Sequence, residues 1–444
     1  MNFIKYDNNR SIQLFKNVLA SFFIKGWSAL VVLMMVPITL SCLGEYQNGV
    51  WLTISSILVW IDQMDIGLGN GLRNRLTIHI AHGNTKEARQ IVSSTIAMLI
   101  CIIFPIMILS ILFIWNTDIY SFLNVIPERI PELRVAFLCA VILVCITFVL
   151  KIIGNVYMGM QLPAVSNFLL AMGQTIALIL TVILYHTGNG SFLLIVIANC
   201  ISPLLVYLIA YPYTFHYKYP ELSPSIRLIN LNSALELGNL GVKFFWLQMA
   251  GLVQFLTANI LISQFFSPAS VTPYQIAYRY VSIVMVAFSI ICMPFWNATT
   301  DAYEQQDTEW IRKANQKMNW MTLGIAALLI IMTIVSPWVY KFWIGEDCHI
   351  PFGMTVMMAL YIFLIVQSMR YSYFLNGIGA LRLQLYMTIM TFIFIPMAWI
   401  VSTTTHNILW FMATMSFCIT PSIIVNMIQF NKIIHNKAEG IWKV

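Results

Sequence analysis

Residues 91–115 read IVSSTIAMLICIIFPIMILSILFIW, a run of 25 residues without a charged side chain. At roughly 1.5 Å of rise per residue, a helix of this length crosses the hydrocarbon core of a bilayer, which is about 30 Å thick. The apolar residues are continuous, whereas the strands of a membrane β-barrel alternate apolar and polar residues. The run therefore predicts a membrane-spanning α-helix and excludes a barrel strand.

The whole chain has the same character. Of its 444 residues, 59% are hydrophobic and only 9% are charged, and the mean hydropathy is +0.80. Soluble domains carry about 25% charged residues, so this chain could not cover the surface of a soluble protein. The composition excludes a soluble enzyme, a nucleic-acid binder and a disordered scaffold. It predicts an all-α polytopic membrane protein with the lipid bilayer as its solvent. The eight cysteines form no CxxC motif and indicate no disulfide framework.

Eleven further runs resemble the first, which gives twelve predicted transmembrane helices. The twelve lie near residues 18–43, 47–69, 91–115, 135–157, 163–185, 191–213, 238–263, 273–297, 319–344, 352–374, 381–402 and 407–430. An even number places both termini on one side of the membrane. Lys and Arg collect in cytoplasmic loops, and the loops on the far side contain only Arg129, Arg134 and Lys341. Both termini are therefore predicted to be cytoplasmic. Two cytoplasmic connections, 70–90 and 298–318, are predicted to form amphipathic surface helices.

The two halves of the chain resemble each other. Lys25 and Lys243 lie at equivalent positions, 218 residues apart, and each is closely followed by a tryptophan. Gly159 and Gly377 match at the same offset. With six spans in each half, the second half starts on the same side as the first, so the halves form a parallel repeat about an axis along the membrane normal. Such repeats are typical of transporters. The predicted domains are two six-helix bundles, residues 1–220 and 221–444.

Ionisable side chains inside the predicted spans are energetically costly and mark functional sites by default. Four cations that line one cavity would form an anion site, and a pyrophosphate suits it because its oxygens accept bonds from point charges. Each cation taken alone could instead extend to the membrane surface and meet water there. The four candidates are Lys25, Lys151, Lys243 and Arg279.

Two acids, Asp62 and Asp65, lie three residues apart and therefore share a face of the second span. One interpretation is coupling of transport to protons or sodium ions. Another is charge pairing with Lys25 or Lys151, and a third is that Asp65 only ends the helix. The buried cations outnumber the acids four to two, which favours an anionic cargo.

Aromatic rings beside hydrogen-bonding groups suit sugars, whose faces are apolar and whose edges are polar. Spans one, seven and eight carry such side chains, although Trp and Tyr also anchor helices at the membrane surface. The candidate sugar contacts are Trp27, Trp246, Gln254, Gln275 and Tyr278.

The motifs of common enzymes are missing from the sequence. It contains no GxxxxGK[ST] phosphate loop, no HExxH metal motif and no GxSxG nucleophile motif. We therefore expect no catalytic residue, no metal site and no cofactor. The alternative from another class is a membrane-embedded polysaccharide polymerase or ligase that would use Glu128 and Glu132 of the longest outer loop. The short outer loops and the repeat argue against it.

Two segments resemble a known family. Residues 60–75 read WIDQMDIGLGNGLRNR, which is similar to the D-x-G-L-G-x-x-L-x-R signature after the second span of Wzx-like polysaccharide flippases of the multidrug/oligosaccharidyl-lipid/polysaccharide (MOP) exporter superfamily. Residues 375–382, LNGIGALR, resemble the N-G-x-G-K-x-R turn before the eleventh span, with Ala380 in place of the usual basic residue. The residues that carry the two motifs are Gly67, Gly69, Gly71, Arg73, Arg75, Gly377 and Gly379.

The resemblance implies a V-shaped fold of two six-helix bundles in the bacterial inner membrane, as in MATE- and MurJ-like transporters. It implies a flippase that moves an undecaprenyl-pyrophosphate-linked oligosaccharide to the periplasmic leaflet by alternating access, for O-antigen, lipopolysaccharide or capsule biosynthesis. A polysaccharide polymerase and the chain-length machinery would be its protein partners, and nucleic acid would not be one. The alternatives are a cation-coupled MATE-type small-molecule exporter and a lipid II-type flippase.

Overall fold

A computed structural model describes residues 2–62, 64, 67–230, 253–254 and 256–443. The described residues form helices and connecting turns, without a β-strand. Ten of the described helical segments are long and apolar enough to cross a bilayer. The chain divides into two compact units, Met1–Phe245 (unit 1) and Trp246–Val444 (unit 2). This boundary falls later in the chain than the boundary expected from the sequence.

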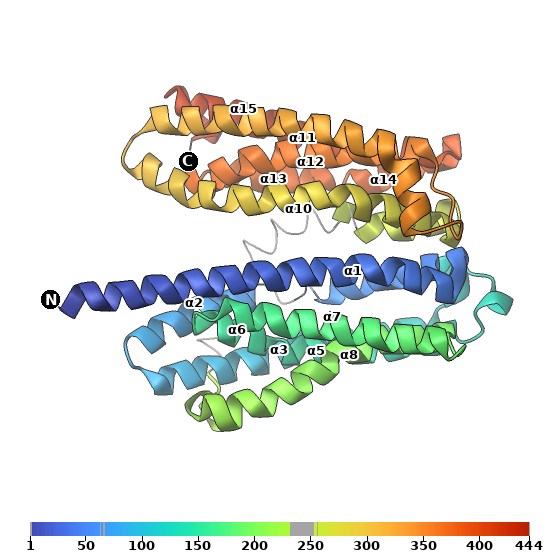
Figure 1. The fold of residues 1–444 in the computed structure, drawn as a ribbon, viewed down its shortest axis with the longest axis horizontal. Coiled ribbons are helices and arrows are strands. Elements are labelled where there is room, and N and C mark those ends of the chain that lie inside the picture. Colours follow the sequence, from blue (N-terminus) through green and yellow to red (C-terminus); the bar gives the residue numbers. More distant parts are fainter. Residues whose placement is uncertain (1, 63, 65–66, 231–252, 255, 444) are drawn as a thin grey trace. The chain divides into compact units, whose positions relative to one another are not determined.

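Among its described residues, unit 1 consists of eight α-helices and four short helical turns, and Figure 1 labels the longer helices. The helices are α1 (Asn2–Asp62), α2 (Leu68–Ala81), α3 (Thr85–Asn116), α4 (Ile119–Leu123), α5 (Leu133–Leu150), α6 (Ile152–Gly159), α7 (Pro163–His186) and α8 (Phe192–Pro212). The turns are η1 (Pro127–Arg129), η2 (Tyr213–Lys218), η3 (Pro220–Leu222) and η4 (Ile226–Leu228).

Helix α1 contains two of the predicted spans. Its segment Ala20–Asp62 has 43 residues, which at roughly 1.5 Å per residue is about twice the thickness of a hydrocarbon core. Gly44 interrupts it with φ 68° and ψ 173°, a backbone conformation that glycine adopts far more readily than other residues. Figure 1 shows the N-terminus and α2 at the same end of unit 1, so the chain reverses its direction within α1.

The described residues of unit 2 form a short apolar helix, Leu256–Phe265, and six further helices (Figure 1). They are α10 (Pro268–Glu304), α11 (Thr308–Trp343), α12 (Phe352–Ile378), α13 (Arg382–Thr391), α14 (Phe394–Thr405) and α15 (Ile408–Ile434), followed by the turn η5 (Gly440–Trp442). Helices α13 and α14 together make one candidate span, Arg382–Thr405. The predicted span 238–263 lies partly outside the described residues, and its described part is Leu256–Phe265.

The two predicted surface helices turn out differently. In unit 1, α2 is a separate helix whose buried face carries Leu68, Leu72 and Leu76. In unit 2, the prediction of a separate helix over 298–318 is wrong. There α10 continues to Glu304 and α11 begins at Thr308. Helix α10 contains no glycine that could interrupt it in the way that Gly67 separates α2 from α1.

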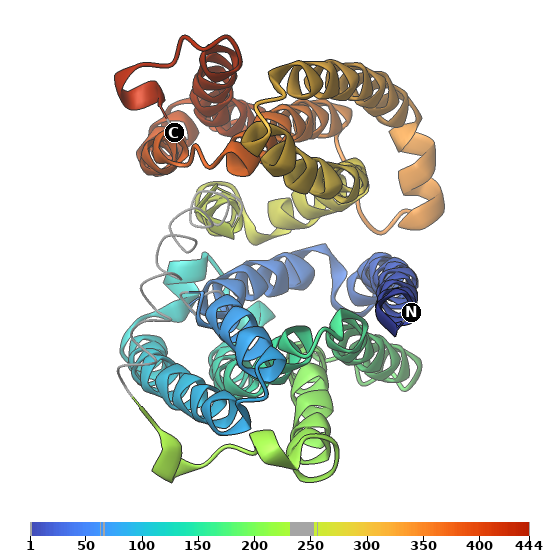
Figure 2. The same cartoon turned by 90° about the vertical axis from the view of Figure 1, so that its left-hand side faces the viewer.

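Each unit packs its helices around its own apolar core, and Figure 2 shows the helices of each unit nearly end-on. In unit 1, α3, α5 and α8 supply fully buried side chains such as Val92, Phe148 and Ile195. In unit 2, Phe374 of α12 stacks against Phe430 of α15 with ring centroids 5.3 Å apart. This packing fixes the helices on which the candidate site residues lie.

Candidate functional site

The four predicted cations fall into different environments. Lys25 lies on α1 and is exposed, and Lys151 lies at the junction of α5 and α6, so both belong to unit 1. Arg279 lies on α10 of unit 2 and is partly buried. The fourth cation, Lys243, lies outside the described residues, as do Asp65 and Trp246.

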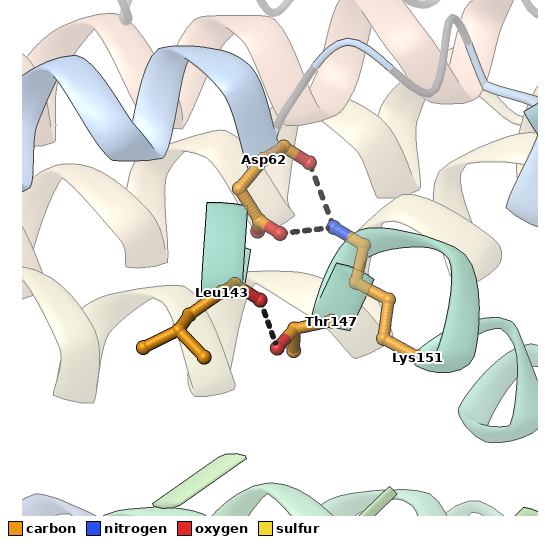
Figure 3. Close-up of polar contacts among 4 residues, drawn as sticks. All are labelled: Asp62, Leu143, Thr147 and Lys151. Atoms are coloured by element: carbon orange, nitrogen blue, oxygen red, sulfur yellow. Dashed lines mark hydrogen bonds and ion pairs between the residues drawn. The ribbon is translucent and has the colours of Figure 1, made fainter. Parts of the chain in front are cut away.

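Lys151 and Asp62 form an ion pair (Figure 3). The Nζ atom of Lys151 lies 2.7 Å from Oδ1 of Asp62 and also donates a hydrogen bond to the backbone carbonyl oxygen of Asp62 at 2.7 Å. Asp62 is the last residue of α1, and the final carbonyls of a helix have no partner within it. Lys151 therefore neutralises the carboxylate and caps the end of α1 with one ammonium group.

The position of Lys151 follows from the break between α5 and α6. Thr147 donates its hydroxyl to the carbonyl oxygen of Leu143 at 2.8 Å, one turn earlier (Figure 3). Such back-bonding bends helices, and Lys151 itself ends α5 and starts α6. Its ammonium also lies 5.1 Å from the ring centroid of Phe148. Of the interpretations given for Asp62, this geometry supports charge pairing with Lys151.

A polar cluster joins α1 to α7 in unit 1. The indole Nε1 of Trp27 donates a hydrogen bond to the hydroxyl of Thr175 at 3.0 Å. The neighbouring Ser28 donates its hydroxyl to the side-chain carbonyl oxygen of Gln174. Side-chain hydrogen bonds of this kind hold membrane helices together. They also fix an exposed indole and two uncharged polar groups beside Lys25.

We define the α1–α7 polar cluster as Lys25, Trp27, Ser28, Gln174 and Thr175. Lys25 is its charged residue. Lys25 precedes Ser28 by three residues, so the two lie on neighbouring turns of one helix face. Within the part of the chain that the structure describes, no carboxylate pairs with Lys25. An exposed ammonium with hydroxyl and amide groups beside it can bind a phosphate oxygen and leave the neighbouring groups for sugar hydroxyls.

The two glutamines proposed as sugar contacts are buried in unit 2. Gln275 is 6% exposed and donates to Oδ1 of Asn259 at 2.7 Å. Gln254 is 4% exposed, donates to the backbone carbonyl of Met415 at 3.3 Å and accepts from the hydroxyl of Tyr361 at 3.4 Å. A sugar could not reach either amide without a rearrangement of unit 2, so their geometry supports a role in joining helices.

The other aromatic candidates remain closer to a surface. Trp27 is 52% exposed, and Tyr278 on α10 is partly buried. Tyr278 lies one residue before Arg279, next to the buried glutamine network. Within the described ranges, no three His, Cys, Asp or Glu side chains come together in a way that could hold a metal ion.

The two glycine motifs lie at helix ends. Gly67 precedes α2 with φ 73° and Gly379 ends α12 with φ 88°, both in the left-handed region. Gly69 and Gly71 of the same motif lie inside α2 and not in the turn that precedes it. Arg73 is exposed on the same helix, as is Arg75.

Arg370 is a buried cation that was not among the four candidate cations. It lies within α12 and is only 5% exposed. Its guanidinium donates to the side-chain oxygens of Asn315, at 2.8 and 2.9 Å, and of Asn319, at 2.7 Å, both on α11. The signal in the sequence was its position inside the apolar run 352–374.

Comparisons with known proteins agree with this helical architecture. No family model matches the chain. A putative O-antigen export protein of Yersinia pseudotuberculosis is 23% identical over 387 residues, which cover 82% of each chain. An inward-facing multidrug resistance MATE family transporter of the MOP superfamily has a TM-score of 0.73 at 16% identity, covering 94% of this chain and 95% of that one. A MATE transporter in complex with MaD3S has a TM-score of 0.59 at 15% identity, covering 93% and 96%. The protein is therefore a multi-pass membrane protein with the fold of the MATE transporters of the MOP superfamily.

Proposed function

We propose that this protein is a flippase for lipid-linked oligosaccharides. Its cargo is an undecaprenyl-pyrophosphate-linked repeat unit, which it moves by alternating access from the cytoplasmic to the periplasmic leaflet of the bacterial inner membrane. The product serves O-antigen or capsule biosynthesis, where a polymerase and the chain-length machinery take over the glycan. Both termini lie in the cytoplasm, and the protein catalyses no covalent chemistry.

One structural observation supports this proposal above the others, namely the exposed ammonium of Lys25 within the α1–α7 polar cluster. A charge inside a membrane span is retained when it binds something, and here no described carboxylate neutralises it. A cargo with a pyrophosphate supplies the missing negative charge. The relative named as a putative O-antigen export protein supports the same class of cargo.

The neighbouring side chains suit the first sugar of such a cargo. Trp27 presents a half-exposed indole, and its Nε1 is already held by Thr175 at 3.0 Å, so the ring is fixed in place. Gln174 and Ser28 supply amide and hydroxyl groups next to it. Lys25 would bind the phosphate oxygens, the indole would stack on a sugar face, and the lipid tail would remain in the bilayer.

Arg279, on α10 of unit 2, stays a cation candidate predicted from the sequence. Lys151 is a weaker candidate for binding cargo, because Asp62 already neutralises its ammonium at 2.7 Å. The cationic site that we propose therefore depends on Lys25 most of all, with Lys243 as its counterpart in the repeat.

The test replaces Lys25 in cells that depend on this protein for their surface polysaccharide. We expect Lys25→Ala to abolish surface glycan while the protein still inserts into the membrane at its normal level, and Lys25→Arg to retain part of the activity. The matched control is Lys341→Ala, because Lys341 is also exposed but lies in the last turn of α11. Normal surface glycan in the Lys25→Ala strain would contradict the proposal.

A binding measurement separates cargo recognition from folding. Purified full-length protein is titrated with farnesyl pyrophosphate, a short prenyl pyrophosphate. Loss of one charge-assisted contact costs about 1.5–3 kcal/mol, so Lys25→Ala should weaken binding by roughly tenfold or more. If Lys25→Ala instead left glycan and binding intact but made cells sensitive to cationic dyes, the small-molecule exporter would be the better assignment.

A further inference from the structure

A groove in unit 1 lies where the first half of α1 ends and the loop between α7 and α8 passes over it. Its volume is about 560 Å³, and its lining includes Ser41, Cys42, Tyr185, Asn189, Gly190 and Ser191. Among the described residues that line the groove, none carries a charge. The groove therefore differs in chemistry from the Lys25 end of the same helix.

The loop that forms one wall is held in place by its own hydrogen bonds. Gly188 adopts φ 70°, which turns the chain at the end of α7. The backbone N–H of Ser191 donates to the carbonyl of Asn189 at 2.8 Å, and the Ser191 hydroxyl accepts from the N–H of Leu194 at 3.3 Å and so caps α8. A Cβ atom at Gly190 would lie 3.5 Å from the Cβ atom of Cys42, so the loop rests against α1. This wall of the groove is therefore formed without a ligand.

The lining has the chemistry of a carbohydrate site. Two serine hydroxyls and the Asn189 amide offer both donors and acceptors. Tyr185 adds an aromatic ring that is 48% exposed, and its ring packs edge-on against His186 at 5.3 Å between centroids. Small-molecule sites combine a few placed polar groups with apolar walls in a concavity of about 300–1,000 Å³, and this groove falls in that range.

The groove and the α1–α7 polar cluster lie on the same pair of helices. Trp27 meets Thr175 in the cluster, and Cys42 meets Gly190 at the groove, so α1 and α7 run side by side in the same direction. The two contacts are fifteen residues apart along α1, which corresponds to about 22 Å at 1.5 Å per residue. That is most of the thickness of a hydrocarbon core. The pair therefore joins a cationic end to a neutral, polar end across the membrane.

We propose that this groove binds neutral sugar residues of the glycan, at the end of the α1–α7 pair opposite Lys25. The inference rests on the proposed flippase function and adds a second binding site to it. The charged pyrophosphate is bound at the Lys25 end, and the sugars that have crossed are bound at the groove. The uncharged lining offers no cation to the pyrophosphate, so the pyrophosphate binds at the Lys25 end and not at the groove. The cargo is therefore bound in one orientation.

Cys42 provides a direct probe, because its side chain lines the groove. The experiment uses purified full-length protein in which the other seven of the eight free cysteines are replaced by alanine. The rate of Cys42 alkylation by a small maleimide is measured with and without the lipid-free repeat-unit oligosaccharide released from the host's own surface polysaccharide. When more than about two thirds of the sites are occupied, alkylation should slow by roughly threefold or more.

Three controls make the outcome specific. Asn189→Ala should remove most of the protection, whereas Thr187→Ala, in the same loop but outside the lining, should retain it. A protein without native cysteines that carries Ser121→Cys, at an exposed position of the short helix α4, should react at the same rate with and without oligosaccharide. Farnesyl pyrophosphate without sugar should leave the Cys42 rate unchanged.

Unchanged alkylation of Cys42 at the highest oligosaccharide concentration would overturn the groove site. Equal protection in the Ser121→Cys control, or protection by farnesyl pyrophosphate alone, would also overturn it. These results are independent of the test of the flippase itself. If Lys25→Ala abolishes surface glycan but Cys42 is never protected, the function stands and the groove site falls. If Cys42 is protected but the Lys25→Ala strain makes normal glycan, the groove stands as a sugar site and the Lys25 model falls.

Discussion

The hydroxyl of Thr77 donates a hydrogen bond to the carbonyl oxygen of Gly159 at 2.8 Å, and this contact has a twin in the other half of the chain. Thr300 donates to the carbonyl of Gly377 at 2.9 Å. Each threonine lies on the helix before a span, and each glycine lies at the end of a later span of the same unit. The two halves therefore repeat a tertiary contact as well as a sequence pattern.

The glycines in these twin contacts allow the helices to approach closely. A Cβ atom at residue 159 would lie 2.9 Å from Cδ2 of Leu76, and one at residue 377 would lie 2.8 Å from the carbonyl oxygen of Trp296. We expect Gly159→Ala and Gly377→Ala to lower the free energy of unfolding by about 1–3 kcal/mol, the usual cost of overpacking. Gly377→Ala should be the more severe, because its obstacle is a backbone atom. Thermal unfolding of the purified protein measures this effect.

Gly324→Ala is the matched control for both variants, since a Cβ atom at this helical position of α11 meets nothing within 4 Å. Its unfolding midpoint should stay the same or rise slightly, as expected for alanine in a helix. A drop as large as that of Gly377→Ala would show that the loss has another cause than steric contact.

The threonine hydroxyls can be tested separately from the glycines. Thr77→Val and Thr300→Val keep the shape of the side chain and remove the donor, so each should cost about 1 kcal/mol of stability. The double variant should lose the sum of the two values, because the contacts lie in separate units and distant sites are additive. A strongly non-additive result would mean that the twin contacts are coupled.

The pair of Asp62 and Lys151 allows a choice between charge pairing and ion coupling. The side chains are 38% and 25% exposed, so solvent screens them, and a double-mutant cycle should give a coupling of only about 0.5–1 kcal/mol. We expect Asp62→Asn alone to impair transport and the neutral double variant Asp62→Asn/Lys151→Met to recover most of it. The readout is surface glycan at equal protein level. If the double variant is as inactive as Asp62→Asn, the carboxylate itself is needed, as ion coupling requires.

Arg370 is expected to be essential for the stability of unit 2. Its guanidinium makes bonds to Asn315 and Asn319 that an ammonium cannot reproduce, because lysine lacks the planar fork of donors. Arg370→Leu removes the charge-assisted hydrogen bonds to Asn315, which is partly buried, and to Asn319, which is exposed, and should cost about 2 kcal/mol. Arg370→Lys should recover only part of this loss. Resistance to limited proteolysis and the unfolding midpoint check this. Arg382→Leu, an exposed arginine at the start of α13, should leave both unchanged.

Much of the fold could be predicted from the sequence, because a membrane span is recognised by the length and hydrophobicity of an apolar run. A run such as 91–115 has to become a helix, since only a helix satisfies every backbone group in lipid without a partner strand. The described helix Thr85–Asn116 contains it. The break at Gly44 falls between the predicted spans 18–43 and 47–69. The separate surface helix predicted over 298–318 does not form, because α10 and α11 extend into that segment.

The candidate site was less accessible to prediction. The sequence alone identifies Lys25, Lys151, Asp62 and Gln275 as polar residues within apolar spans. Such residues stand out because placing a polar side chain in a membrane span costs free energy. The sequence could not say which of them would be satisfied by the protein. That depends on helices far apart in the chain, as when Lys151 reaches the end of α1 and Gln275 reaches Asn259.

The sequence by itself determined that this protein is a bundle of membrane helices with a duplicated half. Hydropathy and span length do not depend on neighbours, so they can be read residue by residue. Only the tertiary structure decided which charges remain available: Asp62 neutralises Lys151, while Lys25 stays exposed next to Trp27. The physical reason is that an ion pair requires two groups to meet within about 4 Å, and packing alone brings residues 89 positions apart to that distance.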